Sequence, residues 1–272
     1  FSKELCIMGL YNNRIVVKVG TSTLTNDAGK SDLRTTDRLA CVLSDIQNMG
    51  YEVVLVSSGA IAVGRNKLNM TAKPDSMRMK QAAAAVGQCS LMYLYDKFFG
   101  DYDKTVAQIL LNADDIEEEE KKENLINTFN ALLEMGVIPI VNENDSVSYK
   151  EIESEDRLFG DNDMLSAVVA VLCRAKHLVI FSDIDGFYDH DPRLYPNAQL
   201  IDQIDTIDDS VYALAGGAGS RRGTGGMRTK LQAASLATSQ GTNTIVTNGK
   251  RPEVLYDIVK GGRAGTLFPG KI

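Results

Sequence analysis

Apolar residues along the chain occur in two spacings, and each spacing predicts a different element. Short runs rich in β-branched residues predict buried strands at residues 14–19, 52–57, 104–110, 137–141, 177–181 and 243–246. Longer stretches with helical spacing predict helices at residues 35–49, 77–99, 121–135, 162–173 and 227–239. Apolar strands that alternate with helices are typical of a parallel sheet covered on both faces. We therefore expect an α/β fold, a three-layer α/β/α sandwich with a mostly parallel central sheet.

No boundary divides this succession of elements. The chain has no internal repeat, no low-complexity block and no linker rich in Pro, Gly or Ser. We expect one folding unit with two lobes that meet near residue 170. The acidic run at 114–123 leads into a helical pattern, so we interpret it as a solvated helix start rather than a binding tail. The charged stretch at 149–157 predicts a hairpin or a flexible loop.

Composition and net charge indicate which classes of partner the protein can bind. The chain has 272 residues, of which 44% are hydrophobic and 24% charged, which is ordinary for a globular protein. Its formal net charge is −7, and the sequence contains no basic stripe or Lys/Arg cluster. Binding to a phosphate backbone needs concentrated positive charge, so we expect no nucleic-acid partner. A single anionic substrate stays possible, because one local group of cations can bind it.

Cysteine and histidine usage argues against a metal site in the protein. The four cysteines lie far apart and form no CxxC pair (Cys6, Cys41, Cys89 and Cys173), and the chain has only two histidines. We interpret the cysteines as buried thiols of a protein in a reducing cytoplasm. No apolar run approaches the roughly 20 residues of a membrane span, and the N-terminus shows no signal-peptide core. We expect a cytoplasmic protein with no membrane partner.

Candidate chemistry gathers where the predicted strands end, which is where open α/β sheets bind ligands. The first segment is the run from Lys18 to Ser22. A lysine near the end of an apolar strand is costly to bury without an anionic partner. Gly20 allows close approach of the backbone to a ligand, and nearby amides and hydroxyls can bind phosphate oxygens. The structural alternative is that Lys18 only pairs with a neighbouring aspartate.

Three further polar segments follow predicted strands or open helices. Ser58 and Gly59 lie between a strand and a helical stretch, where free amides attract a carboxylate or phosphate, although such a turn is often only a connection. Four polar residues, 142–145, end the next buried strand, which is more than solvation requires. The run at 160–163 has the composition of a helix cap, but a cap explains one of these residues and not three.

A glycine-rich segment at 223–230 leads directly into a strong helical pattern. Gly225 and Gly226 allow close approach to phosphates, and helical side chains lean toward the N-terminus, which would carry Lys230 toward an anion held there. The spacing matches neither the Walker A loop nor the GxGxxG fingerprint, and a flexible surface turn is the alternative. The segment at 182–188, after another strand, suits an adenine or ribose contact or a simple Asp-Gly turn.

Six segments in a fixed order resemble the amino-acid kinase family, and within it the enzymes that phosphorylate glutamate. The matching segments are VVKVGTSTLT at 16–25, VSSGAIAVG at 56–64, VIPIVNENDSV at 137–147, GDNDMLSA at 160–167, SDIDGFY at 182–188 followed by DPR, and GTGGMRTKLQAA at 223–234. Together they run from about Arg14 to Phe268. The resemblance implies a single amino-acid kinase domain over 11–268, with an N-terminal lobe to about 170 that binds the amino acid and a C-terminal lobe from about 171 that binds ATP. Many such enzymes continue into a PUA domain, and we expect a short form, or a fragment cut before that domain.

The implied reaction is phosphorylation of the side-chain carboxylate of L-glutamate by ATP with Mg²⁺, the first step of proline synthesis. Its nucleophile has an unperturbed pKa of about 4.3 and needs no general base. The protein must instead stabilise charge on the transferred phosphoryl group, for which we expect Lys18 and Lys230, with Asp163 orienting both lysines. We expect no protein metal site, because Mg²⁺ would be held mainly by ATP phosphates and water.

Binding residues are carried over from the family motifs by their positions in this sequence. The resemblance implies that glutamate is bound by Ser58, Asp145 and Asn162. It also implies an ATP site formed by Lys18, Gly20, Ser182, Asp183, Thr224, Gly225, Gly226, Met227, Arg228, Thr229 and Lys230.

The resemblance leaves several alternatives and implies two further partners. A kinase of the same fold acting on acetylglutamate, aspartate, carbamate or UMP is the nearest rival, and a non-catalytic nucleotide sensor is the rival of another class. Asp145 favours an acceptor with a free amino group, which an acetylated amino acid lacks. We also expect L-proline as a feedback inhibitor and a homo-oligomer, either a dimer or a tetramer.

Overall fold

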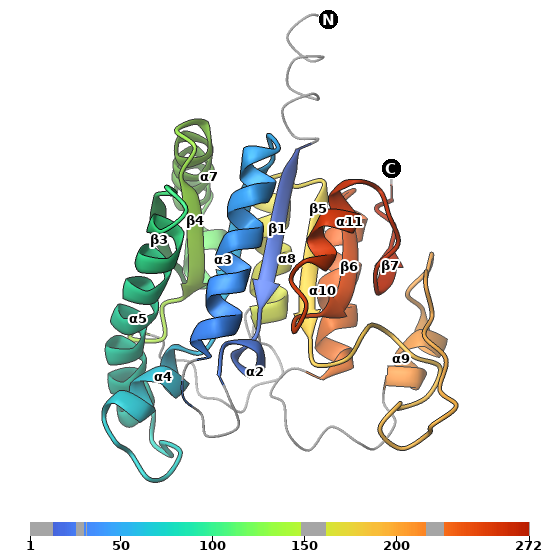
Figure 1. Ribbon diagram of the computed structural model, residues 1–272, viewed down its shortest axis with the longest axis horizontal. Helices are drawn as coiled ribbons and strands as arrows, with labels where there is room; N and C mark the ends of the chain where they lie inside the picture. The colour runs from blue at the N-terminus through green and yellow to red at the C-terminus, as the bar shows by residue number, and fades with distance from the viewer. Residues whose placement is uncertain (1–12, 26–29, 31, 148–161, 216–225, 272) are drawn as a thin grey trace, which may run out of the picture.

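A twisted seven-stranded sheet forms the centre of the molecule (Figure 1). The computed structural model describes residues 13–25, 30, 32–147, 162–215 and 226–271. The strands lie in the order β3-β4-β2-β1-β5-β6-β7, with every neighbouring pair parallel except β6 and β7. Their bounds are β1 Arg14–Val19, β2 Glu52–Ser57, β3 Val106–Leu111, β4 Ile138–Glu143, β5 His177–Ser182, β6 Asn243–Asn248 and β7 Thr266–Phe268.

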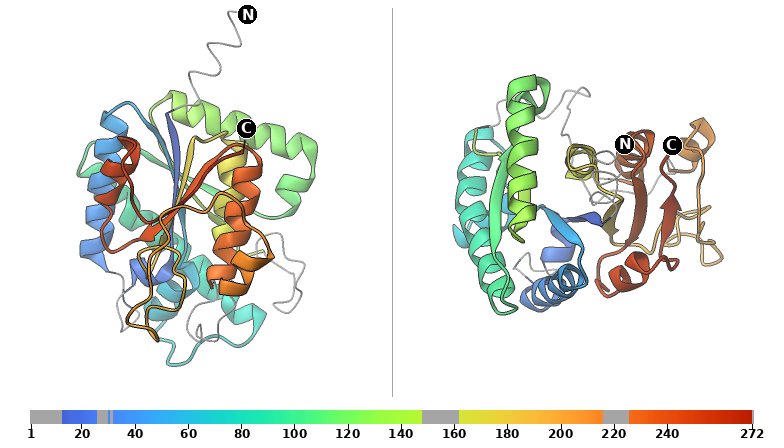
Figure 2. Two further views of the ribbon diagram at one scale, coloured as in Figure 1. Left: turned by 90° about the vertical axis from the view of Figure 1, so that its right-hand side faces the viewer. Right: turned by 90° about the horizontal axis from the view of Figure 1, so that it is seen from above.

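Helices cover both faces of this sheet (Figure 2). On one face lie helices whose apolar residues share a core with the sheet: α3 Leu33–Asn48, α4 Ala60–Lys67, α5 Met77–Gly100 and α11 Val254–Val259. On the other face lie α7 Glu119–Glu134, α8 Asn162–Leu172 and α10 Met227–Ser239. Three short helices complete the set: α2 Thr21–Leu24, α6 Asp114–Glu117 and α9 Asp209–Ala215. The expected three-layer sandwich with a mostly parallel sheet is therefore confirmed.

Alternation along the central strand divides the core into its two halves. In β1, Ile15 and Val17 pack with the layer of α3 and α5, whereas Val16 packs with the layer of α7, α8 and α10. Successive side chains of a strand point to opposite faces, so a strand that is apolar throughout has to be covered twice. All six residues of β1 are buried, as such a strand requires.

Most predicted elements agree with the structure to within two residues, and the differences lie at their ends. The predicted and observed bounds coincide for β1, β2 and α10. Helix α3 begins at Leu33 rather than residue 35, because the side chain of Asp32 accepts a hydrogen bond from the Thr35 amide and caps the helix earlier. Within the acidic run, α6 and the start of α7 are helical, with Glu119 and Glu120 in the first turn of α7. The loop predicted at 149–157 lies outside the described residues.

One part of the cysteine interpretation is wrong. Cys173 is buried and Cys41 partly buried, as free thiols, but Cys89 is exposed on α5. A helix has a solvent side, and Cys89 lies next to Gln88, which faces the sheet through a hydrogen bond to Asn142. Cys6 lies outside the described residues.

Helices α4 and α5 approach each other more closely than side chains would allow. A Cβ atom added at Gly64 would lie 1.8 Å from the carbonyl oxygen of Ala83, and one added at Gly87 would lie 1.7 Å from the carbonyl oxygen of Ala60. Both distances are far below van der Waals contact, so the two backbones touch directly only because these residues are glycines. The contact fixes α5 against the turn that connects β2 to α4.

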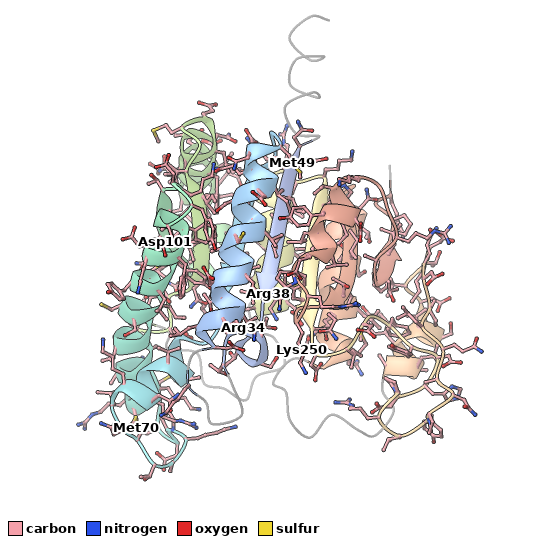
Figure 3. The ribbon with its side chains drawn as sticks, viewed as in Figure 1. Arg34, Arg38, Met49, Met70, Asp101 and Lys250 are labelled. Atoms are coloured by element: carbon pink, nitrogen blue, oxygen red, sulfur yellow. The ribbon has the colours of Figure 1, made fainter. Side chains whose placement is uncertain are left out.

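The carboxyl ends of the parallel strands meet at the lower edge of the sheet as drawn in Figure 1. Arg34, in the first turn of α3, and Lys250, just after β6, lie at this edge, whereas Met49 marks the opposite end of α3 (Figure 3). Strand β1 lies at the centre, and the chain builds β2 and β4 on one side of it before it crosses to β5 on the other. Such a reversal of strand order is where open α/β sheets bind ligands.

Candidate active site

Two lysines and one aspartate form a buried cluster at the carboxyl edge of the sheet, here named the charged cluster. Lys18 lies on β1, Asp163 in the first turn of α8 and Lys230 in the first turn of α10. The Lys18 Nζ atom lies 2.6 Å from Asp163 Oδ1, and Lys230 Nζ lies 3.0 Å from Asp163 Oδ2. Asp163 has no exposed surface, and the lysines are 5% and 7% exposed. Segments far apart in the sequence therefore meet at a single carboxylate.

The charged cluster has a positive excess that suits an anion. Burial alone would raise the pKa of Asp163, but the ammonium groups of Lys18 and Lys230 outweigh it and hold the pKa below its usual value. The carboxylate is therefore ionised at neutral pH, and it also accepts a hydrogen bond from Thr229 Oγ1 at 3.0 Å. Two positive charges and one negative charge leave the cluster at +1. Buried charge of this kind is stabilised by a partner of opposite sign, such as a phosphate group.

Two glycine turns come together beside the charged cluster. A Cβ atom added at Gly20 would lie 3.5 Å from the Lys18 Nζ atom, which is van der Waals contact, so the turn after β1 lies directly beside the ammonium group. Gly59 has φ of +101°, a left-handed conformation that favours glycine, and it turns the chain from β2 into α4. A Cβ atom at Gly59 would lie 3.6 Å from the side chain of Thr21. The turns after β1 and β2 are therefore in contact.

A group of uncharged polar side chains, here named the amide cluster, adjoins the charged cluster. The side-chain amide of Asn162 donates to Ser58 Oγ at 2.8 Å, to Asn142 Oδ1 at 3.1 Å and to the Ser57 carbonyl at 2.7 Å. We define the amide cluster as Ser58, Asn142 and Asn162. Because Asn162 precedes Asp163, one peptide bond joins the two clusters at the start of α8.

Asp145 lies beside a small cavity next to the amide cluster. The cavity is lined by Ala60, Ala84, Ala85, Gln88, Leu110, Glu143, Asn144, Asp145 and Ser146. Gln88 belongs both to this lining and to the hydrogen-bond network, since its Oε1 atom accepts from Asn142 Nδ2 at 2.9 Å. Ser58 and Asn162 are not part of the lining. Gln88 thus links the cavity beside Asp145 to the amide cluster through its hydrogen bond to Asn142.

The residues expected to bind the nucleotide base or ribose lie at the end of β5. Ser182 is buried and donates from Oγ to Asp183 Oδ1 at 3.3 Å. Asp183 is exposed, and its Oδ2 atom lies 4.0 Å from Arg193 Nη1, whereas Arg193 Nε pairs with Asp191 Oδ1 at 3.0 Å. Arg193, the last residue of the DPR stretch, thus lies near the end of β5, and the carboxylate of Asp183 stays accessible to solvent.

The start of α10 supplies the last predicted residues. Gly226 is the N-cap, and its carbonyl accepts hydrogen bonds from the Thr229 amide and hydroxyl. The guanidinium of Arg228 lies 6.0 Å from the ring centroid of Tyr212 on α9, so it points to a different partner than Lys230 does. Met227 is partly buried next to these residues. Thr224 and Gly225 lie outside the described residues.

Sequence reasoning selected the charged residues but missed two neutral ones on α5. Gln88 bonds Asn142, and the hydroxyl of Tyr95 bonds Ser57 Oγ at 2.8 Å. A usable signal existed in the spacing, because residues 84, 88, 91 and 95 form one helical stripe in which Ala84 and Leu91 are buried. A glutamine on an otherwise apolar stripe has to find a partner inside the protein.

Two absences apply to the part of the chain that the structure describes. Its His, Cys, Asp and Glu side chains form no group of three that could hold a metal ion. None of its helices combines the length and apolar character needed to cross a membrane.

Comparison with known proteins identifies the family. The model of the amino acid kinase family matches residues 13–248. The chain belongs to the amino acid kinase family. Within this family, it is 55% identical over 260 residues to the glutamate 5-kinase of Clostridium perfringens, an alignment that covers 96% of each chain. It is 50% identical to the glutamate 5-kinase of Listeria innocua, covering 96% of this chain and 94% of the relative.

A solved structure of the family shows the same fold at low sequence identity. The carbamate kinase from Giardia lamblia bound to AMP-PNP superposes with a TM-score of 0.67 at 15% identity, covering 95% of this chain and 98% of that chain. At this identity the likeness concerns the arrangement of the sheet and its helices. The choice of substrate has to be argued from the site itself.

Proposed function

We propose that this protein is an ATP-dependent kinase that transfers the γ-phosphoryl group to the side-chain carboxylate of L-glutamate, forming L-glutamyl 5-phosphate, the first step of proline synthesis. The observation that carries the proposal is the direct succession of Asn162 and Asp163, which brings the amide cluster and the charged cluster side by side. The amide cluster can bind a carboxylate through uncharged hydrogen-bonding groups, and the charged cluster can bind a phosphate. The two curated relatives at 50% identity or more support glutamate as the acceptor.

Phosphoryl transfer to a carboxylate requires stabilisation of negative charge in the transition state rather than a general base. The attacking carboxylate has an unperturbed pKa of about 4.3 and is ionised at neutral pH. An oxygen of this carboxylate forms the new bond to the γ-phosphorus while the bond from that phosphorus to the bridging oxygen breaks, and ADP leaves. Negative charge moves onto the phosphoryl oxygens and the leaving oxygen, and preorganised cations stabilise it. Lys18 and Lys230 are such cations, because Asp163 fixes both before any ligand binds.

The two lobes divide the ligands between them in this proposal. The acceptor lies in the part before about residue 170, where Asp145 receives the substrate ammonium group and Ser58 and Asn162 bind its carboxylates. ATP lies on the part from about residue 171, near Ser182 and Asp183 and the start of α10, with Lys18 of β1 reaching the phosphates from the other side. The contact between the turns of Gly20 and Gly59 supports a short distance between the two ligands, because it brings the turn proposed for the phosphates against the turn that carries Ser58.

Magnesium fits the site as a companion of the nucleotide. Both oxygens of Asp163 contact lysines, so that carboxylate is committed to orienting the cations. Mg²⁺ keeps several waters and is commonly held through substrate phosphates, where it neutralises part of their charge. We therefore assign it to the ATP phosphates and water rather than to a protein cage.

Regulation by L-proline is part of the same proposal. Proline carries an ammonium group and an α-carboxylate but no side-chain carboxylate, so it can fill only part of the acceptor site. Asp145 would receive the ammonium group of either ligand, which makes the two compete. This competition follows from the chemistry that glutamate and proline share.

A trapping experiment tests the acceptor. The protein is supplied with ATP, Mg²⁺ and hydroxylamine together with glutamate, aspartate, N-acetylglutamate, carbamate or UMP, and hydroxamate and ADP are measured. Hydroxylamine converts an acyl phosphate to a hydroxamate, so we expect product with glutamate and little with the others. Turnover of N-acetylglutamate equal to or above that of glutamate would reject the assignment.

A further inference from the structure

A buried tyrosine on α5 contacts the strand end that carries the amide cluster. The Tyr95 hydroxyl lies 2.8 Å from Ser57 Oγ, and the two residues are 1% and 2% exposed. Burial raises the pKa of Tyr95, which keeps the phenol neutral and able to donate. A buried hydroxyl without a partner costs free energy, so this contact fixes the position of Ser57 relative to α5.

Ser57 connects Tyr95 to the amide cluster through a further hydrogen bond. Its carbonyl accepts the hydrogen bond from Asn162 Nδ2 at 2.7 Å, and its Oγ atom lies 3.3 Å from the Ser58 carbonyl. The Ser58 amide in turn donates to the Val19 carbonyl of β1 at 3.1 Å. The hydroxyl of Tyr95 is therefore two hydrogen bonds away from Asn162 and one residue away from Ser58.

The network returns to α5 through Gln88. Asn162 donates to Asn142 Oδ1, and Asn142 Nδ2 donates to Gln88 Oε1 at 2.9 Å. Gln88 and Tyr95 are seven residues apart and thus lie on the same stripe of the helix, two turns from each other. Hydrogen bonds consequently form a closed path that begins and ends on α5 and has Asn162 at its middle.

The path explains why Asn162 faces the amide cluster with its NH₂ group. Asn142 Nδ2 is committed to Gln88, so Asn142 presents its oxygen to Asn162. The Ser57 carbonyl presents a second oxygen. Two fixed acceptors direct the nitrogen of Asn162 toward them and the Oδ1 atom away, and networks of this kind hold their members more firmly than isolated bonds do.

We propose that Tyr95, acting through Ser57, is a positioning residue that holds Ser58 and Asn162 in the geometry needed to bind the acceptor. The inference rests on the proposed function, because it concerns the same acceptor site. Tyr95 touches neither the cavity beside Asp145 nor the charged cluster. Its loss should therefore change binding of the amino acid and leave binding of ATP and the phosphoryl-transfer cations in place.

The test compares Tyr95→Phe, Ser57→Ala and the double variant by their steady-state kinetics. Phe keeps the ring and removes only the hydroxyl. We expect each single variant to raise KM for glutamate by about 3- to 10-fold, the range expected for one net hydrogen bond, with KM for ATP and kcat within about twofold of wild type. The double variant should resemble Ser57→Ala, because the Tyr95 hydroxyl has already lost its partner in that variant.

Tyr102→Phe is the matched control. Tyr102 lies just beyond α5, and its hydroxyl donates to Asp37 Oδ1 at 3.0 Å, in a contact with no link to the amide cluster. This variant should lower the thermal midpoint by an amount similar to Tyr95→Phe while leaving both KM values unchanged. If the two KM values rise together in Tyr95→Phe, or if Tyr95→Phe and Ser57→Ala are additive, the positioning role is wrong.

The same measurements separate this inference from the proposed function. Absence of glutamate turnover by the wild-type protein rejects the proposed substrate, and the KM ratio is then measured with the acceptor that the trapping panel identifies. Normal wild-type turnover together with an unchanged ratio of KM values in Tyr95→Phe rejects the positioning role alone.

Discussion

The charged cluster and the amide cluster are neighbours at the start of α8, but different forces hold them. Lys18 and Lys230 are fixed by opposite charge at one carboxylate, in a buried setting where Coulomb interactions are strong. The amide cluster has no net charge and depends on directed hydrogen bonds to Ser57 and Gln88. We therefore expect that phosphoryl transfer and acceptor binding can be impaired independently, although Asn162 and Asp163 are adjacent.

Removing a lysine of the charged cluster should have the largest effect. Lys18→Ala and Lys230→Ala should each lower kcat by on the order of 100-fold or more, because losing one preorganised charge contact to a transition state costs about 3 to 4 kcal/mol. KM for glutamate should change much less. Single-turnover and steady-state assays with saturating ATP measure the effect.

A matched variant on the same edge controls for general loss of charge. Arg34→Ala removes an exposed cation at the carboxyl edge of the sheet, outside the charged cluster, and should keep kcat near the wild-type value. If Lys18→Ala or Lys230→Ala also kept near-normal kcat, that lysine would serve only to neutralise Asp163.

Changing the acceptor side should shift affinity instead of rate. Asp145→Ala should raise KM for glutamate by about 10- to 150-fold, the range expected for a charge-assisted hydrogen bond worth roughly 1.5 to 3 kcal/mol, with little change in KM for ATP. Initial rates over a grid of both substrates give the two values. A matched rise in both KM values would show that the turn at residues 144–147 had collapsed. It would contradict the proposal that acceptor binding can be changed separately from ATP binding.

The same variant tests the shared site for proline. Titration of proline at several glutamate concentrations should show competition in the wild type, and Asp145→Ala should weaken proline inhibition along with glutamate binding. Inhibition that follows ATP instead of glutamate, or no inhibition at millimolar proline, would remove this part of the proposal.

Lowering the pH should reduce the stability that the charged cluster contributes and leave the contribution of the amide cluster unchanged. We expect this effect to be smaller than those of the substitutions above. The folded pKa of Asp163 lies below its unfolded value of about 3.9, so the folded state binds its proton less readily than the unfolded state. The ionised carboxylate therefore contributes stability above about pH 4 that is lost as the pH falls through the folded pKa, by at most about 1.4 kcal/mol per pH unit for one proton.

Urea unfolding between about pH 5 and pH 3 checks this sign. Asp163→Asn should flatten the loss of stability with falling pH, whereas Asn162→Ala should keep the wild-type slope because amides do not titrate. Equal slopes in wild type and Asp163→Asn would mean that other carboxylates control acid sensitivity.

Sequence patterns were sufficient to predict the elements whose bounds depend on local residues. The apolar run of β1 and the helical pattern that follows the glycines before α10 predict the bounds of these elements without reference to the rest of the chain. Lys18 could be selected because a lysine on an apolar strand needs a partner, Lys230 because its helix follows a glycine-rich segment, and Asp163 because the reaction implied by the resemblance needs a group that orients both lysines. That all three meet at one carboxylate depends on the order of the strands, which neighbouring residues do not encode.

Local patterns are weaker signals for elements that depend on contacts with distant parts of the chain. Strand β7 has three residues and exists only because it pairs antiparallel with β6, so no periodicity could reveal it. The helical stripe of Gln88 and Tyr95 indicates that both side chains face inward, but it does not indicate their partners. Their roles follow from Asn142 and Ser57, which the fold brings to α5 from other strands.

The glycine contact between α4 and α5 bears on how the acceptor site could be redesigned. Substitution at Gly64 or Gly87 would separate the helices, since an added methyl group would overlap the carbonyl oxygen of Ala83 or Ala60. The cavity wall next to this contact includes the small side chains of Ala84 and Ala85, together with Gln88, which holds Asn142. A library that varies the two alanines and keeps Gln88 and both glycines would alter the volume offered to the acceptor while the contact between the helices is kept. The same helix pair thus contains a backbone contact that has to be kept and, close to it in sequence, cavity-lining alanines that can be substituted.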